Sequence, residues 1–247
     1  MNFKDNFSAH SAIYARYRPL YPAPLFEWLA SLVKEHELAW DCGTGNGQCA
    51  VSLAKYFQHV FATDPSEQQI SHAIPDKRVT YKVEKAEQSS LENGTADLVT
   101  IAQALHWFSF DAFYAEVKRV LKKGGIIAAW AYGLPSCNEE IDALLWDFHE
   151  NLVGAYWQEE NRMIDKGYAT IPFPFTKIVA PVFSMQKEWT FEEMMGHVET
   201  WSATQRYTRS EKADPLPELR KKLASAWGND PIRAMNWELI LLAGRYS

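Results

Sequence analysis

The chain has 247 residues, of which 47% are hydrophobic, so it is long enough to bury the core of one large domain. Its 25 Lys and Arg are outnumbered by 31 Asp and Glu, and the scattered basic residues exclude the basic surface typical of nucleic-acid-binding proteins. No apolar run approaches the roughly 18 residues of a membrane span, and the amino terminus lacks a signal-peptide pattern. We therefore expect a cytoplasmic protein without nucleic-acid or membrane partners.

The cysteines and aromatic residues limit the chemistry further. Cys42, Cys49 and Cys137 have neither the spacing of metal ligands nor an even number for disulfides. We expect buried thiols and no metal site. Aromatic residues make up 14% of the chain, which suits a pocket with apolar walls as well as an ordinary core.

The first half of the chain alternates strand and helix patterns. Residues 1–21 lack periodicity and are followed by a helical pattern at 24–34. A short apolar run ending at Asp41 predicts a buried strand, and it is followed by glycines and a helical pattern at 49–57. The later expectations are a strand at 59–64, a helix at 67–73 capped by Ser66, strands at 79–83, 97–102 and 125–130, and a helix at 110–121.

This alternation predicts a doubly wound α/β fold with a mostly parallel sheet, because nearly continuous apolar strands are typical of sheets covered by helices on both faces. After residue 134 the pattern changes to helices and irregular aromatic stretches, which we interpret as an insertion over the sheet. We expect an edge strand at 177–185, where Pro181 disfavours a central position, helices at 191–199, 202–209 and 214–226, and a final strand at 236–244.

The most informative motif follows the first strand. Asp41 precedes Gly43, Gly45 and Gly47, whereas the dinucleotide fingerprint places its third glycine three residues after the second. Glycines let the backbone turn sharply and approach a ligand, and the helix that follows offers unpaired N–H groups. This spacing predicts a nucleotide-type ligand other than a dinucleotide.

Two acids define that ligand. Asp64 follows the motif at the roughly 20-residue distance typical of an acid that binds ribose hydroxyls. Asp41, two residues before the first glycine, would lie where a cationic amine binds. A ligand with both a ribose and an ammonium group fits S-adenosyl-L-methionine better than NAD.

These segments resemble class I S-adenosylmethionine-dependent methyltransferases of the type 11-like group. Residues 41–48 and 62–66 resemble the first two family motifs, 86–87 the segment that borders the adenine, 103–108 the segment after the fourth strand, and 121–125 the turn before the fifth. Residues 14–19 and 201–203 resemble the subgroup that contains trans-aconitate methyltransferase. The resemblance covers roughly residues 10–132, and it implies a seven-stranded Rossmann-like sheet with an antiparallel edge.

The motifs and the resemblance together give the candidate cofactor site and the organisation of the chain. We expect one methyltransferase domain over 1–247, with a lid at 1–21, a cofactor-binding core at 24–132 and a helical, substrate-side segment at 134–230. Glu87 accepts a hydrogen bond from the adenine amino group or is a solvated loop acid. The candidate cofactor-binding residues are Asp41, Gly43, Thr44, Gly45, Gly47, Gln48, Asp64, Pro65, Ala86, Glu87, Gln103 and Ala104.

The candidate catalytic residues are His106 and Tyr14. His106 is either a general base for a hydroxyl or amine nucleophile, or a structural residue packed on Trp107. Transfer from a sulfonium can rely on positioning alone, and a carboxylate acceptor needs no base. The resemblance to trans-aconitate methyltransferase implies such a carboxylate, and the candidate substrate-binding residues are Arg18, Trp107, Trp201 and Arg206.

Two other functions remain open at this stage. One is an NAD-dependent oxidoreductase, which the glycine spacing opposes, and the other is a non-catalytic protein of the same fold that binds the cofactor. We expect a small-molecule acceptor and a monomer or homodimer. The sequence does not specify the acceptor.

Overall fold

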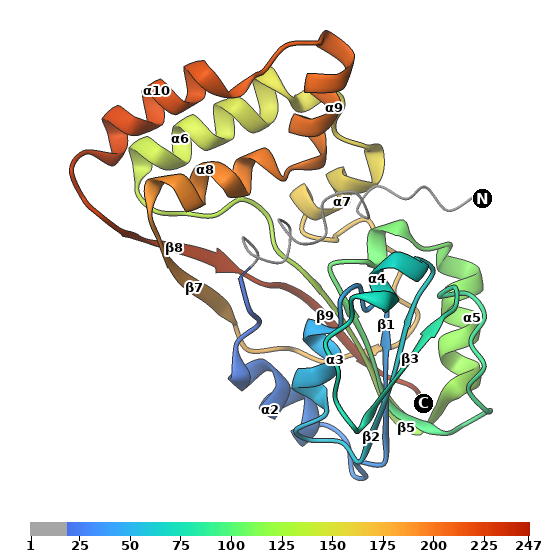
Figure 1. Cartoon of the computed structure of the whole chain (residues 1–247). Coiled ribbons are helices and arrows are strands. Elements are labelled where there is room, and N and C mark those ends of the chain that lie inside the picture. The colour runs from blue at the N-terminus through green and yellow to red at the C-terminus, as the bar shows by residue number, and fades with distance from the viewer. Residues whose placement is uncertain (1–18) are drawn as a thin grey trace.

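The computed structural model describes residues 19–247, and Tyr14 and Arg18 lie outside this range. Its centre is a seven-stranded sheet in the order β3-β2-β1-β4-β5-β9-β6 (Figure 1). β1 to β5 are parallel, whereas β9 runs antiparallel to both β5 and β6. The strands are β1 Leu38–Cys42, β2 His59–Asp64, β3 Val79–Val83, β4 Ala96–Ala102, β5 Leu121–Ala131, β6 Thr176–Lys177 and β9 Ile240–Arg245.

Helices cover both faces of this sheet because its central strands are apolar on both sides. Along β5, Ile126 and Trp130 belong to the buried cluster of α2 and α3, whereas Ile127 and Ala131 belong to that of α5. Successive strand residues point to opposite faces, so one continuous apolar run supplies both clusters. The predicted doubly wound fold is confirmed. Its helices are α2 Ala23–Ser31, α3 Gln48–Leu53, α4 Glu67–Ser71 and α5 Phe110–Val120.

A helical layer lies beyond the carboxyl ends of the parallel strands (Figure 1). It contains α6 Glu139–Asp147, α8 Phe191–Glu199, α9 Ser202–Glu211 and α10 Leu216–Trp227. Buried residues of this layer, among them Ile141, Met194 and Leu223, belong to the same apolar cluster as Trp130 of the sheet. The layer and the sheet therefore share one core. The boundaries at 24–132 and 134–230 stay a prediction.

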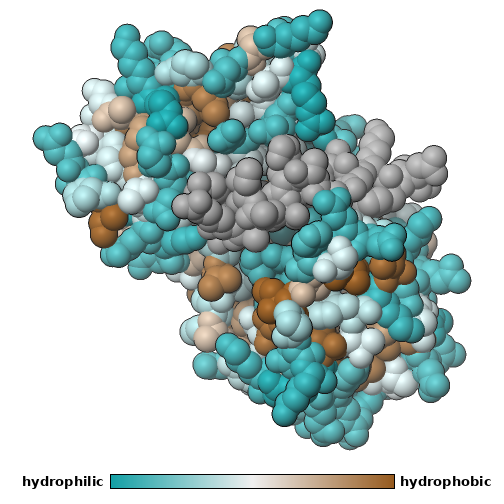
Figure 2. All heavy atoms as spheres, in the orientation of Figure 1, coloured by the Kyte–Doolittle hydropathy of each residue, from teal (hydrophilic) through white to brown (hydrophobic). Residues whose placement is uncertain are grey.

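The segment between α6 and β6 is a series of short turns. It consists of η3 Phe148–Leu152, η4 Gly154–Tyr156, η5 Glu159–Asn161 and α7 Arg162–Asp165. Figure 2 shows hydrophilic side chains over most of the visible face of the sheet region and of the helical layer. Within residues 19–247, no helix combines the length and the apolar character that a membrane crossing requires.

Most predicted elements appear near their expected positions. The glycine turn leads into α3, α4 begins after Ser66, and the Ser66 hydroxyl accepts a hydrogen bond from the Gln69 N–H at 3.2 Å, as expected of an N-cap. The helical patterns at 191–199, 202–209 and 214–226 correspond to α8, α9 and α10. Local periodicity and capping therefore identify these elements correctly.

The predicted strand at 177–185 is wrong. β6 ends at Lys177, and the next strand, β7 Ser184–Trp189, belongs to a separate two-stranded sheet with β8 Arg233–Glu238. The intervening residues, which include Pro181, are not strand, and Val179 is 95% exposed. Pro181 cannot donate to a sheet ladder, and the run loses its partner strand where it leaves the main sheet.

The predicted final strand at 236–244 is wrong in the same way, because the structure divides it at Leu239. The first part belongs to β8 and pairs with β7, whereas the second part is β9, which lies between β5 and β6. The Leu239 N–H donates to the Phe183 carbonyl at 2.9 Å, at the point where both strands change sheets. An unbroken apolar pattern does not record this exchange of partners.

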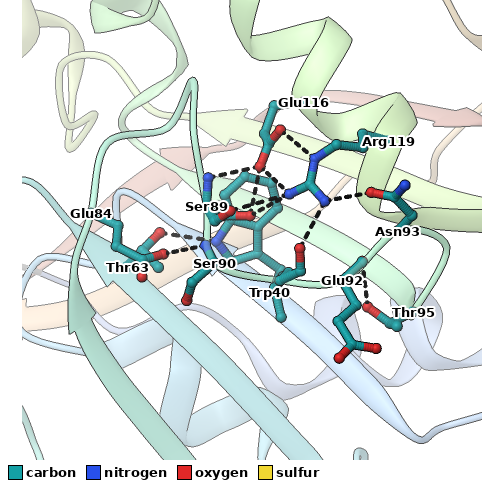
Figure 3. A network of polar contacts seen from close by, with 11 residues as sticks. Trp40, Thr63, Glu84, Ser89, Ser90, Glu92, Asn93, Thr95, Glu116 and Arg119 are labelled. Carbon is teal, nitrogen blue, oxygen red and sulfur yellow. Dashed lines mark hydrogen bonds and ion pairs between the residues drawn. The ribbon is translucent and has the colours of Figure 1, made fainter.

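An ion pair between the buried Glu116 and the partly exposed Arg119 fastens the loop after β3 to α5 (Figure 3). The Glu116 carboxylate accepts hydrogen bonds at 2.7 Å from both the N–H and the hydroxyl of Ser89, and at 2.6 Å from the Arg119 guanidinium. Arg119 also donates to the carbonyl of Leu91 and to the side chain of Asn93. The loop that contains residues 86–87 is thereby held against the helix.

Replacing Glu116 by Gln should destabilise the fold in a pH-dependent way. Burial raises the pKa of Glu116, but the donors of Arg119 and Ser89 outweigh this effect and lower it to about 2 from its usual 4.5. The stabilisation is therefore complete above pH 4.5 and is lost as the pH falls towards 2. At pH 7 we expect the variant to lose about 1–3 kcal/mol of unfolding free energy in urea titrations.

The exposed Glu92, on the same loop, provides the control. Glu92→Gln should leave the unfolding free energy unchanged at every pH. An equal loss in both variants, or a Glu116→Gln loss that persists undiminished under acid conditions, would contradict the ion pair's contribution.

Candidate active site

The glycine turn occupies the point at which the sheet order reverses. Loops after β1 and β4 leave neighbouring parallel strands, and ligands of open α/β sheets bind in the crevice at such a place. The Thr63 carbonyl at the end of β2 accepts hydrogen bonds from Gly43 at 2.8 Å and from Thr44 at 2.9 Å. The turn is therefore fixed to the ends of two strands.

The three glycines of the turn have different neighbours. All three have positive φ, but a Cβ on Gly43 would lie 2.7 Å from the Ala104 Cβ, and one on Gly47 would lie 2.2 Å from the Tyr81 hydroxyl. Among residues 19–247, a Cβ on Gly45 would meet no atom closer than the Gln69 side chain at 4.0 Å. Packing explains the first and third glycines. Of the three, Gly45 alone has an α-carbon beside space that no described residue fills.

Asp41 lies beneath this turn. It is fully buried, and its two carboxylate oxygens accept hydrogen bonds from the hydroxyls of Thr44 at 2.5 Å and Thr100 at 2.8 Å. Burial raises its pKa, whereas hydrogen bonds from Cys49, Thr44 and Thr100 oppose the rise. The carboxylate therefore connects the glycine turn to β4. Its predicted contact with a cationic amine would have to be made from this enclosed position.

Asp64 lies at the end of β2 and is 9% exposed. One of its oxygens accepts from the Gly45 N–H and the other from the Ser66 N–H, both at 2.9 Å. The acid predicted to bind a ribose is therefore hydrogen-bonded to the glycine whose α-carbon faces open space. Pro65 lies between Asp64 and Ser66, in the loop that connects β2 to α4. Gln48 is the first residue of α3, directly after the glycine turn.

The predicted adenine segment follows β3, whose carboxyl end lies at the same edge of the sheet as those of β1 and β2. Ala86 is buried at 6% exposure, and Glu87 accepts a hydrogen bond from the Ser109 N–H at 3.0 Å, at the start of α5. The carboxylate of Glu87 is thus anchored to α5 rather than solvated freely. Its contact with an adenine stays a prediction.

Gln103 joins the carboxyl ends of β4 and β5. It has a positive φ of 57°, which is uncommon for a residue with a Cβ. Its side chain donates to the Tyr132 carbonyl at 3.0 Å and accepts from the Tyr132 N–H at 2.9 Å. This pairing imitates a further step of the strand ladder, and it positions the turn that contains Ala104, beside Gly43.

A pocket lies between these strand ends and the helical layer. The structure brings Gln103, His106, Trp107 and Trp201 together in its wall, although Trp201 lies far along the chain. None of the described residues in this wall is a lysine or an arginine. The other lining residues are Tyr132, Gly133, Leu134, His149, Trp157, Asn161, Ile164, Asp165, His197, Thr200 and Ser202.

Arg206 is not part of this wall. It donates a hydrogen bond to the Tyr156 carbonyl at 3.1 Å, and burial lowers its pKa. Tyr14 and Arg18, the other two residues predicted for the acceptor side, lie outside the described residues. A substrate-binding role for either arginine stays a prediction.

His106 is on η2 Leu105–Trp107, directly after β4. It is 3% exposed, packs against Trp107 with ring centroids 4.9 Å apart, and forms a 3.0 Å hydrogen bond between Nδ1 and the Tyr168 hydroxyl. Burial lowers its pKa to about 3, so it is neutral at ordinary pH. His106 therefore packs on Trp107, as the structural alternative predicted, and it also lines the pocket.

Sequence reasoning missed Tyr168 and the lining residues between α6 and α8. His149, Trp157 and Trp201 form an aromatic group, with ring centroids 4.8 to 6.1 Å apart. His149 and Asp165 also belong to an acidic group of metal-ligating geometry, but Arg162 donates to both of its carboxylates. Trp201 was predicted from the resemblance, but no local motif marks His149, Trp157 or Tyr168, because they come from separate irregular segments.

Known proteins with similar sequences and folds are methyltransferases by name. Residues 40–129 match the family model of a methyltransferase domain. A provisionally named methyltransferase of Dictyostelium discoideum is 34% identical over 229 residues, covering 91% of this chain and 87% of that protein. A provisionally named S-adenosylmethionine-dependent methyltransferase of Saccharomyces cerevisiae is 27% identical over 176 residues, covering 66% of this chain and 60% of that protein.

A solved structure agrees with these relatives. It is that of a provisionally named type II methyltransferase from Anaeromyxobacter dehalogenans, which is 38% identical with a TM-score of 0.87, covering 93% of this chain and 98% of the other. The likeness spans the helical layer as well as the sheet. This chain belongs to the class I S-adenosylmethionine-dependent methyltransferases.

Proposed function

We propose that the protein transfers the methyl group of S-adenosylmethionine to a small-molecule acceptor in the pocket beside His106 and Trp201. The observation that carries the proposal is that no described residue fills the space beside Gly45, whose N–H donates to the Asp64 carboxylate. S-adenosylmethionine supplies an electrophilic methyl on a sulfonium with a good leaving group. The protein's task is then to orient the two molecules and to exclude water.

The proposed cofactor contacts follow the crevice from one side to the other. Asp64 accepts from the ribose hydroxyls, the segment at Ala86 and Glu87 borders the adenine, and the backbone from Gly43 to Gly45 approaches the methionine part. Gln103 and Ala104 line the methionine end. Gly45 supports this fit, because the described residues around it leave room for a ligand.

The acceptor side is the finer part of the proposal. We assign Trp107 and Trp201 as its walls, and residues 1–21 as a lid. The carboxylate acceptor implied by the likeness to trans-aconitate methyltransferase is retained, with Arg18 and Arg206 as candidate partners. The glycine spacing and the family oppose the NAD-dependent alternative. A non-catalytic cofactor-binding protein would bind S-adenosylmethionine as the proposed enzyme does, and would differ from it only in showing no turnover.

Replacing Gly45 by Ala should weaken cofactor binding at least tenfold with little effect on the fold. Among residues 19–247 the new Cβ meets no atom closer than 4.0 Å, so the cost to folding is mainly that of a positive φ, about 1 kcal/mol. The same Cβ enters the space proposed for the ligand. Calorimetry should show at least a tenfold loss of S-adenosylmethionine affinity, equivalent to about 1.4 kcal/mol.

Gly94 is the matched control for this variant. It also has a positive φ, +64° against +55°, and no atom lies within 4 Å of its Cβ position, but it is on an exposed loop outside the crevice. Gly94→Ala should carry the same conformational cost and bind the cofactor normally. Equal affinities in the two variants would mean that Gly45 serves only the turn.

Asp64→Ala should weaken S-adenosylmethionine binding by roughly 1–3 kcal/mol, through the loss of a charged acceptor for the ribose hydroxyls. Calorimetry against wild type measures this loss, and the exposed acid Glu140, replaced by Ala, is the control. NADH titrated in the same way should bind neither protein. Unchanged affinity in Asp64→Ala would remove the ribose assignment, and tight NADH binding would favour the oxidoreductase.

The acceptor class can be tested with a panel of carboxylic acids, phenols and amines. If the acceptor is a carboxylate, Arg18→Gln or Arg206→Gln should raise its KM about tenfold or more, because a charge-assisted hydrogen bond is lost. The affinity for S-adenosylmethionine should not change. Methylation of amines or phenols alone would exclude the carboxylate, and no turnover at all would favour the non-catalytic alternative.

A further inference from the structure

We propose that Tyr168 fixes His106 as the tautomer that carries its proton on Nε2, so that His106 is a hydrogen-bond donor to the acceptor and not a general base. This inference rests on the proposed function, because it concerns the same acceptor pocket. It assigns a positioning role to Tyr168, which no sequence motif identifies. The acceptor it implies presents an oxygen with a lone pair to His106 and brings its nucleophilic atom already deprotonated.

The first step is the hydrogen bonding of the Tyr168 hydroxyl. This group is buried at 1% exposure, and its partner is His106 Nδ1 at 3.0 Å. Burial and the nearby Tyr114 raise the pKa of Tyr168, so the phenol keeps its hydrogen at ordinary pH. That buried hydrogen needs an acceptor.

The second step follows from where that hydrogen can go. If Nδ1 carried a proton, it would donate to the phenol, and the Tyr168 hydrogen would need another acceptor. Among residues 19–247 the neighbouring candidate is the Tyr114 hydroxyl, which is buried and forms no hydrogen bond. A buried donor without a partner is costly. The satisfied arrangement has the Tyr168 O–H donating to Nδ1, and neutral imidazole then carries its proton on Nε2.

The third step places Nε2. Nδ1 is occupied by Tyr168, the ring lines the pocket, and the described residues give Nε2 no hydrogen-bond partner. A protonated Nε2 cannot remove a proton from a substrate, but it can donate to an oxygen. The other titratable groups among the described wall residues are Tyr132, next to the end of β5, His149 and Asp165 of the segment between α6 and β6, and His197 of α8.

The backbone at Tyr168 supports a positioning role. Its φ is +59°, and it follows Gly167, whose φ is +62°, at the end of α7. Two consecutive left-handed residues reverse the chain and direct the tyrosine ring towards η2. A bulky residue at positive φ is strained, and such strain persists where the surroundings enforce it.

The tautomer can be measured without knowing the acceptor. In the full-length protein labelled with ¹⁵N-histidine, two-bond ¹H–¹⁵N spectra from pH 5.5 to 8.5 distinguish the two neutral forms and the imidazolium, and His106→Gln assigns the signal. We expect His106 to show a protonated Nε2 throughout. A protonated Nδ1, or an imidazolium that titrates near the usual histidine pKa, would overturn the proposal.

Tyr168→Phe tests the cause of this tautomer. It should convert the His106 signal into a mixture of tautomers, while calorimetry with S-adenosylmethionine gives an unchanged Kd. Tyr114→Phe, which removes the neighbouring hydroxyl, is the matched control and should leave the spectrum as in wild type. An unaltered Nε2–H signal in Tyr168→Phe would mean that another group sets the tautomer.

Turnover separates donor from base. With the acceptor that the panel identifies, His106→Ala should raise the acceptor KM about tenfold or more. His106→Gln, whose amide also donates, should have an acceptor KM about tenfold lower than that of His106→Ala. Equal losses of kcat in both variants would indicate a base. If the protein fails to bind S-adenosylmethionine or to turn over, the proposed function fails, but the tautomer spectra still decide this inference.

Discussion

The Thr63 carbonyl accepts hydrogen bonds from both Gly43 and Thr44, and the rest of the crevice depends on this contact. It joins the end of β2 to the turn after β1, while the buried carboxylate of Asp41 joins the same turn to Thr100 of β4. Three strand ends are thereby fixed relative to one another before any ligand arrives. Because the turn is held from below, its outer residue, Gly45, is left facing open space.

The elements of the fold were predictable where their signal is local. The buried runs of β4 and β5, the period of α5 and the Ser66 cap are properties of a few consecutive residues, and the structure has all of them. The predictions of single strands at 177–185 and 236–244 were wrong because a strand also needs a partner strand, which a local pattern does not specify. At Leu239 the chain exchanges one partner for another without any change in its apolar pattern.

The candidate site divides along the same line. The cofactor side consists of loops that each follow a strand, so a motif, its spacing and a parallel sheet were enough to bring Asp41, Asp64 and Gln103 to one edge. The acceptor side is assembled from η2 and from segments that follow α6. Tyr168 lies in an irregular stretch, and only its left-handed backbone brings its hydroxyl to His106. A single tyrosine in such a stretch gives no signal in the sequence.

The charges of the pocket favour a particular kind of methyl transfer. When a sulfonium reacts with an oxyanion, a positive and a negative charge disappear together, and a site of low polarity assists such a reaction. A guanidinium bonded to the attacking oxygen itself, rather than to the other oxygen of a carboxylate, would oppose it, because it would stabilise the anion that must react. A neutral imidazole N–H on the oxygen holds the acceptor with less stabilisation of its charge. A wall whose described residues include tryptophans and uncharged His106, but no lysine or arginine, is suited to that task.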